Sequence, residues 1–352
     1  MTPPSSAEIE AAPAEVTGDA TSRQVRIPRL GFLGLGWIGR RRLRTLVESG
    51  AAPVAALSDC SAASLAEAAT IAPEAATALA IEELLEERLD GIVIATPSGL
   101  HAEQCLKALE RGVAVFCQKP LARNAAETRR IIDAARTADR LLGIDFSYRH
   151  VEAFARPLSI VQAGELGDIY AVDLTFHNAY GPDKGWCKDR ALAGGGCLID
   201  LGVHLVDYAL LVLGNPEVRE VWARLVSQGV ALSDHEHQVE DYAVGQFTTA
   251  RGATVRLACS WWASIGQGAI IEAVFHGTRG AVRVSNVNGS FFDFRCERMH
   301  GDKREVLVEP PDAWEGRALV AWARQLARNP RYDPSVESAV RVAEVLDRMY
   351  EA

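Results

Sequence analysis

Short apolar runs alternate with longer amphipathic stretches over the first 150 residues, and this alternation constrains the fold more than any other feature. The stretches between the runs carry apolar residues at three- and four-residue spacing, which is typical of helices. Strands that are apolar throughout must be covered on both faces, so the alternation predicts an α/β fold with a parallel, doubly wound sheet. The expected strands are Leu30–Leu35, Pro53–Asp59, Gly91–Thr96, Val113–Cys117 and Leu141–Phe146.

Beyond Arg149 the pattern changes to strands in series, separated by glycine-bearing turns. Such a series predicts an α+β domain with a large, mainly antiparallel open sheet. The expected strands are Asp168–His177, Val218–Ser227, Asp241–Thr248, Thr254–Trp262, Ile270–His276 and Ala281–Val284. The expected helices are Glu152–Ala163, Cys197–Leu213, Gly316–Arg328 and Pro334–Tyr350. The last two helices are candidates to pack back on the first domain.

Residues 1–24 consist mostly of Ala, Pro, Glu and Ser, with little to bury, and we expect a disordered tail. This stretch lacks the basic and apolar regions of a secretory signal, and no apolar run reaches the roughly 18 residues of a membrane helix. Seven cysteines, an odd number without a CxxC spacing, indicate reduced thiols and a cytoplasmic location.

The net charge of −9 and the lack of a long Lys/Arg run argue against a nucleic-acid partner. The densest basic cluster, formed by the arginines of 40–44, falls on one short helix, where we expect a solvated face. Asp234-His235-Glu236-His237 resembles a metal tract, but it lies in a polar stretch without a distant further ligand. We therefore expect a solvated turn and no metal.

A GxGxxG motif, Gly34-Leu35-Gly36-Trp37-Ile38-Gly39, follows the first expected strand and opens a helix. Gly34 permits a tight turn, Gly36 lets a pyrophosphate approach the backbone, and Gly39 lets the helix pack on the strand. Asp59 stands 20 residues after Gly39 at the end of the second strand, where a carboxylate accepts hydrogen bonds from the adenosine ribose. The motif predicts a dinucleotide site that takes NAD, with NADP disfavoured by the Asp59 charge.

Two further strand ends should border this cofactor site, because ligands gather beyond the carboxyl ends of parallel strands. One carries Gln118-Lys119-Pro120, from which Lys119 could reach a reacting carbon. The other carries Thr96 and Pro97, followed by His101, for which packing at a helix start is an equal alternative to a cofactor contact.

A third motif begins with the glycine triplet 194–196 and continues as an apolar helix with Asp200, His204 and Asp207. The triplet would let the backbone approach a ligand. Asp200 and His204 are four residues apart and share one helix face. Burying ionisable groups on a helix costs free energy unless they are paired or take part in function. Asp200 and His204 are therefore a candidate site.

With these motifs, the chain from about residue 29 onwards resembles the glucose-fructose oxidoreductase / inositol dehydrogenase / rhizopine catabolism protein family. Tyr148-Arg149, Trp186, Glu240-Asp241-Tyr242 and Gly277-Thr278-Arg279-Gly280 add to the resemblance. It implies a Rossmann NAD-binding domain at 25–147 and a substrate-binding and oligomerisation domain at 148–352, in a homodimer or homotetramer.

The resemblance also implies roles for three residues. Lys119 would contact a substrate oxygen and the nicotinamide, Asp200 would bind substrate, and His204 would be the acid/base. At position 118 the family usually has Glu; Gln118 keeps an acceptor but removes a charge beside Lys119. With an ordinary pKa of about 6.5, His204 could take a hydroxyl proton near neutral pH.

These features together predict an NAD-dependent oxidoreductase acting on a carbinol of a sugar or inositol, or on the matching ketone. Tyr180, Lys184, Trp186 and Arg190 precede the glycine triplet and are candidates to line the substrate pocket, with loop packing or solvation as the alternative. Three other functions stay open: a reductase of nucleotide-linked keto-sugars, an NAD-dependent glycosidase, and a non-catalytic NAD-binding regulator.

Overall fold

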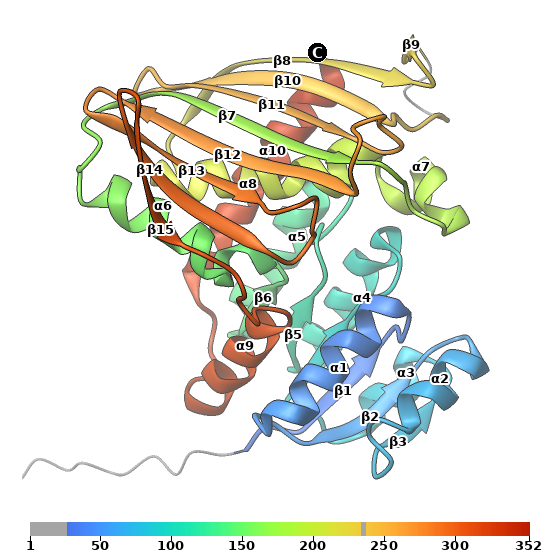
Figure 1. The fold of residues 1–352 in the computed structure, drawn as a ribbon. Coiled ribbons are helices and arrows are strands. Elements are labelled where there is room, and N and C mark those ends of the chain that lie inside the picture. Colours follow the sequence, from blue (N-terminus) through green and yellow to red (C-terminus); the bar gives the residue numbers. More distant parts are fainter. Residues whose placement is uncertain (1–26, 234–236) are drawn as a thin grey trace, which may run out of the picture.

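The computed structural model describes residues 27–233 and 237–352, which form two domains (Figure 1). The expected tail of residues 1–24 lies outside the described residues, as do residues 234–236 of the polar turn. The first domain lies below a broad second sheet in Figure 1, and several helices of the second domain lie between the two sheets.

The first domain contains the predicted doubly wound sheet, six strands in the order β3-β2-β1-β4-β5-β6, all parallel. The short strand β3 is the one that the apolar runs did not indicate; two of its three residues are exposed. The strands are β1 (Leu30–Leu33), β2 (Val54–Ser58), β3 (Ala76–Ala78), β4 (Gly91–Ile94), β5 (Ala114–Cys117) and β6 (Leu142–Ile144). The helices are α1 (Trp37–Ser49), α2 (Ala62–Ala69), α3 (Ile81–Glu86), α4 (Ser98–Glu110) and α5 (Ala125–Ala138).

The second domain contains a nine-stranded sheet in the order β15-β14-β13-β12-β7-β11-β10-β8-β9. All neighbours are antiparallel except β7 and β11, which pair in parallel at the centre of the sheet. The prediction of a large, mainly antiparallel sheet is confirmed, and β9, β14 and β15 are strands that it lacked. The strands are β7 (Ile169–Asn178), β8 (Val218–Ser227), β9 (Val230–Ala231), β10 (Tyr242–Thr249), β11 (Thr254–Ser260), β12 (Ala269–Gly277), β13 (Gly280–Asn286), β14 (Phe294–His300) and β15 (Lys303–Val308).

Helices cover one face of this sheet and leave the other face open (Figure 1). The helical elements are η1 (Ser147–His150), α6 (Glu152–Gln162), η2 (Gly185–Lys188), α7 (Arg190–Ala193), η3 (Leu198–Gly202), α8 (Val203–Val212), α9 (Arg317–Arg328), η4 (Pro334–Glu337) and α10 (Ser338–Glu351). On the covered face, Tyr208 of α8 meets Phe275 edge-on with ring centroids 5.5 Å apart. The open face exposes Tyr170, Trp222 and Tyr242.

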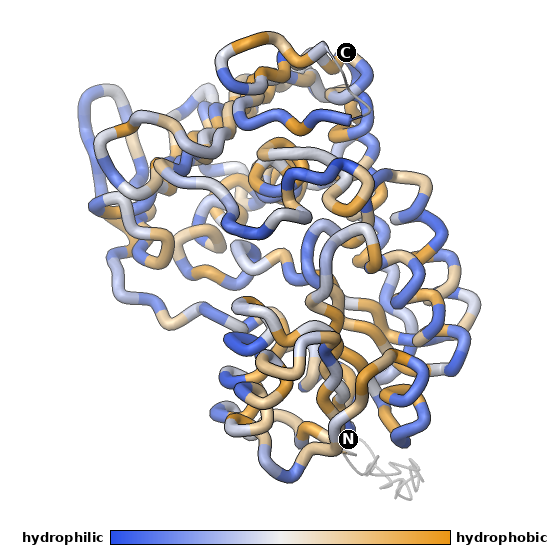
Figure 2. The backbone as a smooth tube through the Cα atoms, turned by 90° about the vertical axis from the view of Figure 1, so that its right-hand side faces the viewer, coloured by the Kyte–Doolittle hydropathy of each residue, from blue (hydrophilic) through white to orange (hydrophobic). Residues whose placement is uncertain are grey.

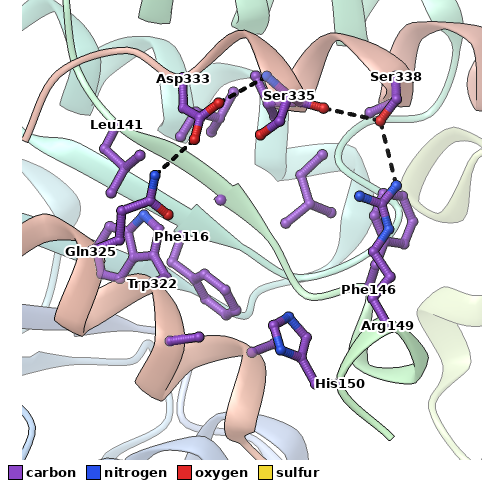
Figure 3. A pocket seen from close by; sticks show the side chains of 17 residues that line it. Phe116, Leu141, Phe146, Arg149, His150, Trp322, Gln325, Asp333, Ser335 and Ser338 are labelled. Carbon is purple, nitrogen blue, oxygen red and sulfur yellow. Dashed lines mark hydrogen bonds between the residues drawn. The ribbon is translucent and has the colours of Figure 1, made fainter. Parts of the chain in front are cut away.

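Helix α9 packs back on the first domain. The Trp322 ring lies 5.6 Å from that of Phe116 on β5, and side chains on Gly91 or Gly143 would collide with it. In the hydropathy view the apolar segments gather inside this domain, and its peripheral helices alternate between apolar and polar (Figure 2). A cavity of about 150 Å³ lies where α9, β6 and the start of α10 meet, with Gln325 bonded to Asp333 on its wall (Figure 3).

One helical segment of the described residues, 190–212, is long and apolar enough to span a membrane by length and composition alone. Within its most apolar window, 83% of the residues are buried inside the protein. The sequence analysis found no such run because Asp200, His204 and Asp207 interrupt it. Burial between the sheet and the first domain accounts for its apolar character.

Candidate active site

The glycine loop connects β1 to α1 with the geometry that the GxGxxG motif predicts. Gly34 has a φ of +88°, and a Cβ placed there would lie 2.6 Å from the backbone of Ala95. A Cβ on Gly39 would lie 2.1 Å from the Gly34 oxygen. Gly36, in contrast, has open space where its side chain would point. The first and last glycines are therefore required by packing, and the middle one leaves room for a ligand.

The beginning of α1 can hold the pyrophosphate of a dinucleotide. No side chain caps this end of the helix, and its first turn contains no acidic residue. Its free N–H groups and the positive end of the helix dipole therefore face the space beside Gly36. Trp37 is 59% exposed next to this space, and Ile38 is half-buried.

Asp59 follows β2 and lies against the glycine loop. One carboxylate oxygen accepts a hydrogen bond from the Leu35 N–H at 2.6 Å, and the other accepts from the Ser61 N–H at 2.7 Å. Each oxygen keeps a further lone pair for a ribose hydroxyl. The structure thus brings Asp59 to the glycine loop, and its role in choosing NAD over NADP stays a prediction.

His101 sits in α4 and connects the two strand ends that carry Thr96-Pro97 and Lys119-Pro120. Its ring nitrogens lie 2.9 Å from the Pro120 oxygen and 2.8 Å from the Thr96 oxygen, and the side chain is 1% exposed. Burial lowers the pKa of His101. With both nitrogens engaged, the geometry favours the packing alternative for His101 over a direct cofactor contact.

Lys119 from the first domain meets Asp200 from the second. The Lys119 ammonium group donates to the backbone oxygen and to the carboxylate of Asp200, each at 2.7 Å. The other carboxylate oxygen of Asp200 accepts from the Trp261 indole at 3.1 Å. Trp261, which the sequence analysis did not single out, therefore fixes the carboxylate that holds Lys119.

His204 lies beside this pair, with its ring edge-on to Tyr148 at a centroid distance of 4.9 Å. Burial lowers the pKa of His204 well below its ordinary value, and the positive charges of Lys119 and then Arg42 lower it further. The ordinary pKa that the sequence suggested for His204 does not hold, because the surroundings of this side chain are set only by the fold. A lowered pKa keeps the imidazole neutral at neutral pH, ready to accept a proton.

The helix that carries Asp200 and His204 begins with a π-helical turn, Leu198–Gly202, where a single α-helix over Cys197–Leu213 was predicted. Such turns often occur at functional sites. Asp207, further along, forms an ion pair with Arg149, whose Nε donates at 2.9 Å. The structure therefore separates Asp207, a structural partner of the η1 turn, from Asp200 and His204.

The glycine triplet serves packing inside the protein, which differs from the expected approach to a ligand. Gly194 has a φ of +86°. A Cβ on Gly195 would lie 2.0 Å from the Tyr350 hydroxyl, and one on Gly196 would lie 1.9 Å from the Glu240 backbone oxygen. Glu240 and Tyr350 thus explain two of the three glycines.

A buried network behind Lys119 was missed by sequence reasoning. Asp145, after β6, accepts a hydrogen bond from Arg42 of α1 at 2.6 Å and another from the Gln118 amide. Arg42 also donates to Ser147 at 3.0 Å. Arg42 is 4% exposed, so this arginine departs from the expected solvated face. The one feature of the sequence that pointed to this network was Gln118, at a position where the family usually has Glu.

Three of the four candidate pocket residues have separate partners. Tyr180 packs on Phe291 at 5.7 Å, Lys184 lies 3.5 Å from Asp183, and the Arg190 guanidinium lies 4.5 Å over the Tyr350 ring. Trp186 lies on the short helix η2. Their contact with substrate stays a prediction. Among residues 27–233 and 237–352, no group of three or more His, Cys, Asp or Glu is placed to hold a metal.

A Rossmann domain with an open glycine loop, facing a second domain that presents Asp200 and His204 to Lys119, defines an NAD(P)-dependent oxidoreductase acting on carbinol or keto groups. Family models agree with this class: the oxidoreductase family with an NAD-binding Rossmann fold matches residues 28–146, and the GFO/IDH/MocA C-terminal domain matches 155–283. The chain belongs to the glucose-fructose oxidoreductase / inositol dehydrogenase / rhizopine catabolism protein family.

Several relatives are similar over most of the chain. The dTDP-3,4-didehydro-2,6-dideoxy-alpha-D-glucose 3-reductase of Streptomyces violaceoruber is 32% identical over 92% of this chain and 86% of its own length. The D-glucoside 3-dehydrogenase of Escherichia coli (strain K12) is 27% identical over 76% of this chain and 78% of its own. A 3-ketoreductase of Actinomadura kijaniata, solved with NADP and TDP-benzene, shares the fold with a TM-score of 0.79, at 21% identity over 93% of this chain and 98% of its own.

Proposed function

We propose that this enzyme oxidises a carbinol of a sugar or cyclitol with NAD, at the cluster formed by Lys119, Asp200 and His204. The observation that carries the proposal is the contact of Lys119 with Asp200 across the two domains, beside an imidazole whose pKa is lowered. A cation, a fixed carboxylate and a neutral base in one place are the groups that carbinol oxidation needs.

Each residue has a separate task in this reaction. When bound, the nicotinamide supplies the acceptor for the hydrogen and electron pair that leave the carbinol carbon. His204 accepts the hydroxyl proton. The Lys119 ammonium group stabilises the developing alkoxide, an effect worth about 3 kcal/mol for one donor. Asp200 holds Lys119 in place and offers its carboxylate to a neighbouring hydroxyl group.

The direct test is to incubate the purified protein with NAD and a panel of inositols, free sugars and glycosides, and to follow the absorbance of reduced nicotinamide. We expect at least one polyol to give steady NADH formation that the Lys119→Ala and His204→Ala variants lack. A panel without any turnover in either direction would contradict the proposal and favour the non-catalytic regulator. Turnover of a glycoside without net NADH would favour the glycosidase.

A second candidate is the reduction of a nucleotide-linked keto-sugar. It is supported by the Streptomyces relative, which is named as a 3-reductase of a dTDP-linked sugar and matches 92% of this chain. The same residues would act in reverse, with Lys119 on the carbonyl oxygen and His204 returning the proton. Consumption of NADH with a nucleotide-linked 3-keto-sugar, much faster than oxidation of any free polyol, would favour this candidate.

We further propose that the enzyme acts in the cytoplasm as a homodimer or homotetramer. The seven cysteines are all free. The open face of the large sheet carries the exposed aromatic residues Tyr170, Trp222 and Tyr242, which a second copy would cover. Light scattering coupled to gel filtration should give a mass of two or four chains, and a monomer at micromolar concentration would contradict this assignment.

A further inference from the structure

The side chain of Glu240 is a fully buried carboxylate, 0% exposed. It lies against the beginning of the segment that carries Asp200 and His204. One oxygen accepts from the Leu198 N–H at 2.8 Å, and the two oxygens share the Gly196 N–H at 3.0 and 3.1 Å. These N–H groups have no partner within the helix, so Glu240 satisfies them and neutralises the positive end of the helix.

Tyr350, two residues before the end of the chain, holds this carboxylate. Its hydroxyl group donates to Glu240 Oε1 at 2.8 Å. On the other side, the Arg190 guanidinium lies over the Tyr350 ring. A cation, an aromatic ring, a hydroxyl group and a buried carboxylate thus form one continuous chain of contacts that ends at the backbone before Asp200.

Helix α10, which carries Tyr350, is tied to both domains. Its Asp347 accepts from the Ala125 N–H at the start of α5 at 2.9 Å, and its Arg348 donates to the Val218 oxygen of β8 at 3.2 Å. The absence of side chains at Gly195 and Gly196 leaves the space that Tyr350 and Glu240 occupy. The position of Tyr350 therefore depends on how the first domain and the large sheet sit against α10.

We infer that Glu240 and Tyr350 are positioning residues for the reaction, and that the last turn of α10 sets the placement of Asp200 and His204 against Lys119. This inference rests on the proposed function for its kinetic consequence. Its structural part, that the Tyr350 hydroxyl orders the segment 196–204, can be measured without any substrate. The hydrogen bonds of Glu240 and Tyr350 connect them to each other and to residues 196–198, so the dissociation constant of NAD should be independent of both residues.

The test compares Tyr350→Phe and Glu240→Gln with the parent enzyme. Tyr350→Phe removes one hydroxyl group, and we expect kcat to fall about 10-fold, because small misplacements of reacting groups are costly. Glu240→Gln keeps the shape but replaces one acceptor by a donor that faces N–H groups, and we expect a fall of about 100-fold. The dissociation constant of NAD should stay within about twofold, and amide exchange over 196–204 should become faster in both variants.

Tyr332→Phe is the matched control, because the Tyr332 hydroxyl also donates to a glutamate at 2.8 Å, Glu337, but in the exposed segment between α9 and α10. It should leave kcat and exchange over 196–204 unchanged. Unchanged exchange in Tyr350→Phe would overturn the inference, as would a fall in kcat equal to that of Tyr332→Phe. Faster exchange in a protein that turns over no polyol would support the inference and count only against the proposed function.

Discussion

The Lys119 ammonium group bonds both to the backbone oxygen and to the carboxylate of Asp200, at 2.7 Å each, across the boundary between the two domains. The two residues are 81 positions apart in sequence. Because the carboxylate is held again by Trp261, the amine has a fixed position beside His204.

Replacement of His204 by alanine should lower kcat by about 10²- to 10⁴-fold, the usual contribution of one positioned acid/base. Steady-state kinetics with the best polyol of the panel would measure this. His300→Ala is the matched control, because His300 lies at the exposed end of β14, with its Nδ1 3.1 Å from the Arg279 oxygen. Full activity in His204→Ala would remove this imidazole from the mechanism.

The acid limb of kcat/KM for oxidation should lie below pH 6.5, the approximate ordinary value for histidine. His204 must be neutral to accept a proton, and its pKa is lowered by burial and by Lys119 and Arg42. A pH profile of the parent enzyme would show the limb, and His204→Ala should lack it. An acid limb above pH 7 would contradict the lowered pKa.

The same lowered pKa affects stability in a defined direction. The unfolded chain takes up the histidine proton at about pH 6.5, whereas folded His204 takes it up only at a lower pH. The contribution of His204 to the free energy of unfolding should therefore be complete above this pH and fall below it. Thermal melts between pH 5 and pH 8 should show a smaller decrease for His204→Ala than for the parent.

Asp59→Asn should shift the cofactor preference towards NADP. The amide oxygen can still accept from the Leu35 N–H, so the glycine loop keeps its support, although the Ser61 N–H loses its acceptor. The charge that repels a 2′-phosphate is gone. We expect the ratio of kcat/KM for NADP over NAD to rise about 10-fold, which corresponds to about 1.4 kcal/mol. An unchanged ratio would mean that Asp59 does not face the ribose.

Gln118→Glu should destabilise the protein by about 2 kcal/mol. It would place a second buried carboxylate against Asp145, and the neighbouring cation, Arg42, is already paired with Asp145. Denaturant unfolding would measure the loss. The double variant Gln118→Glu with Asp145→Asn moves the charge from one residue to the other and should recover most of the stability. A fully stable single variant would contradict the repulsion predicted between the two buried carboxylates.

The sequence predicted the features that depend on local pattern. The parallel sheet follows from apolar runs at regular spacing, and the dinucleotide loop follows from Gly34, Gly36 and Gly39, whose geometry the structure reproduces. The short strands β3 and β9 and the outer strands β14 and β15 were absent from the prediction. These strands are largely exposed or contain charged residues between their apolar ones, so they lack the apolar runs by which strands are predicted.

Residues whose importance comes from distant partners could not be found in this way. Arg42 belongs to an arginine-rich helix that reads as a solvated face, and only the approach of Asp145 from β6 makes it a buried ion-pair partner. Glu240 counted in the sequence only as part of a family feature, and its contact with the beginning of the helix of residues 198–212 appears only in the fold. His101 was balanced between two roles, and two carbonyl contacts favour packing.

By itself the sequence determined the two-domain organisation, the cofactor loop and the identity of Lys119, Asp200 and His204 as candidate groups, because spacing along the chain encodes strand ends and helix faces. Tertiary structure alone decided that these groups meet, that burial and neighbouring cations keep His204 neutral, and that Glu240 and Tyr350 occupy the space left by two glycines. Solvent exclusion and long-range contacts set such properties, and both arise only when segments far apart in the chain are packed together.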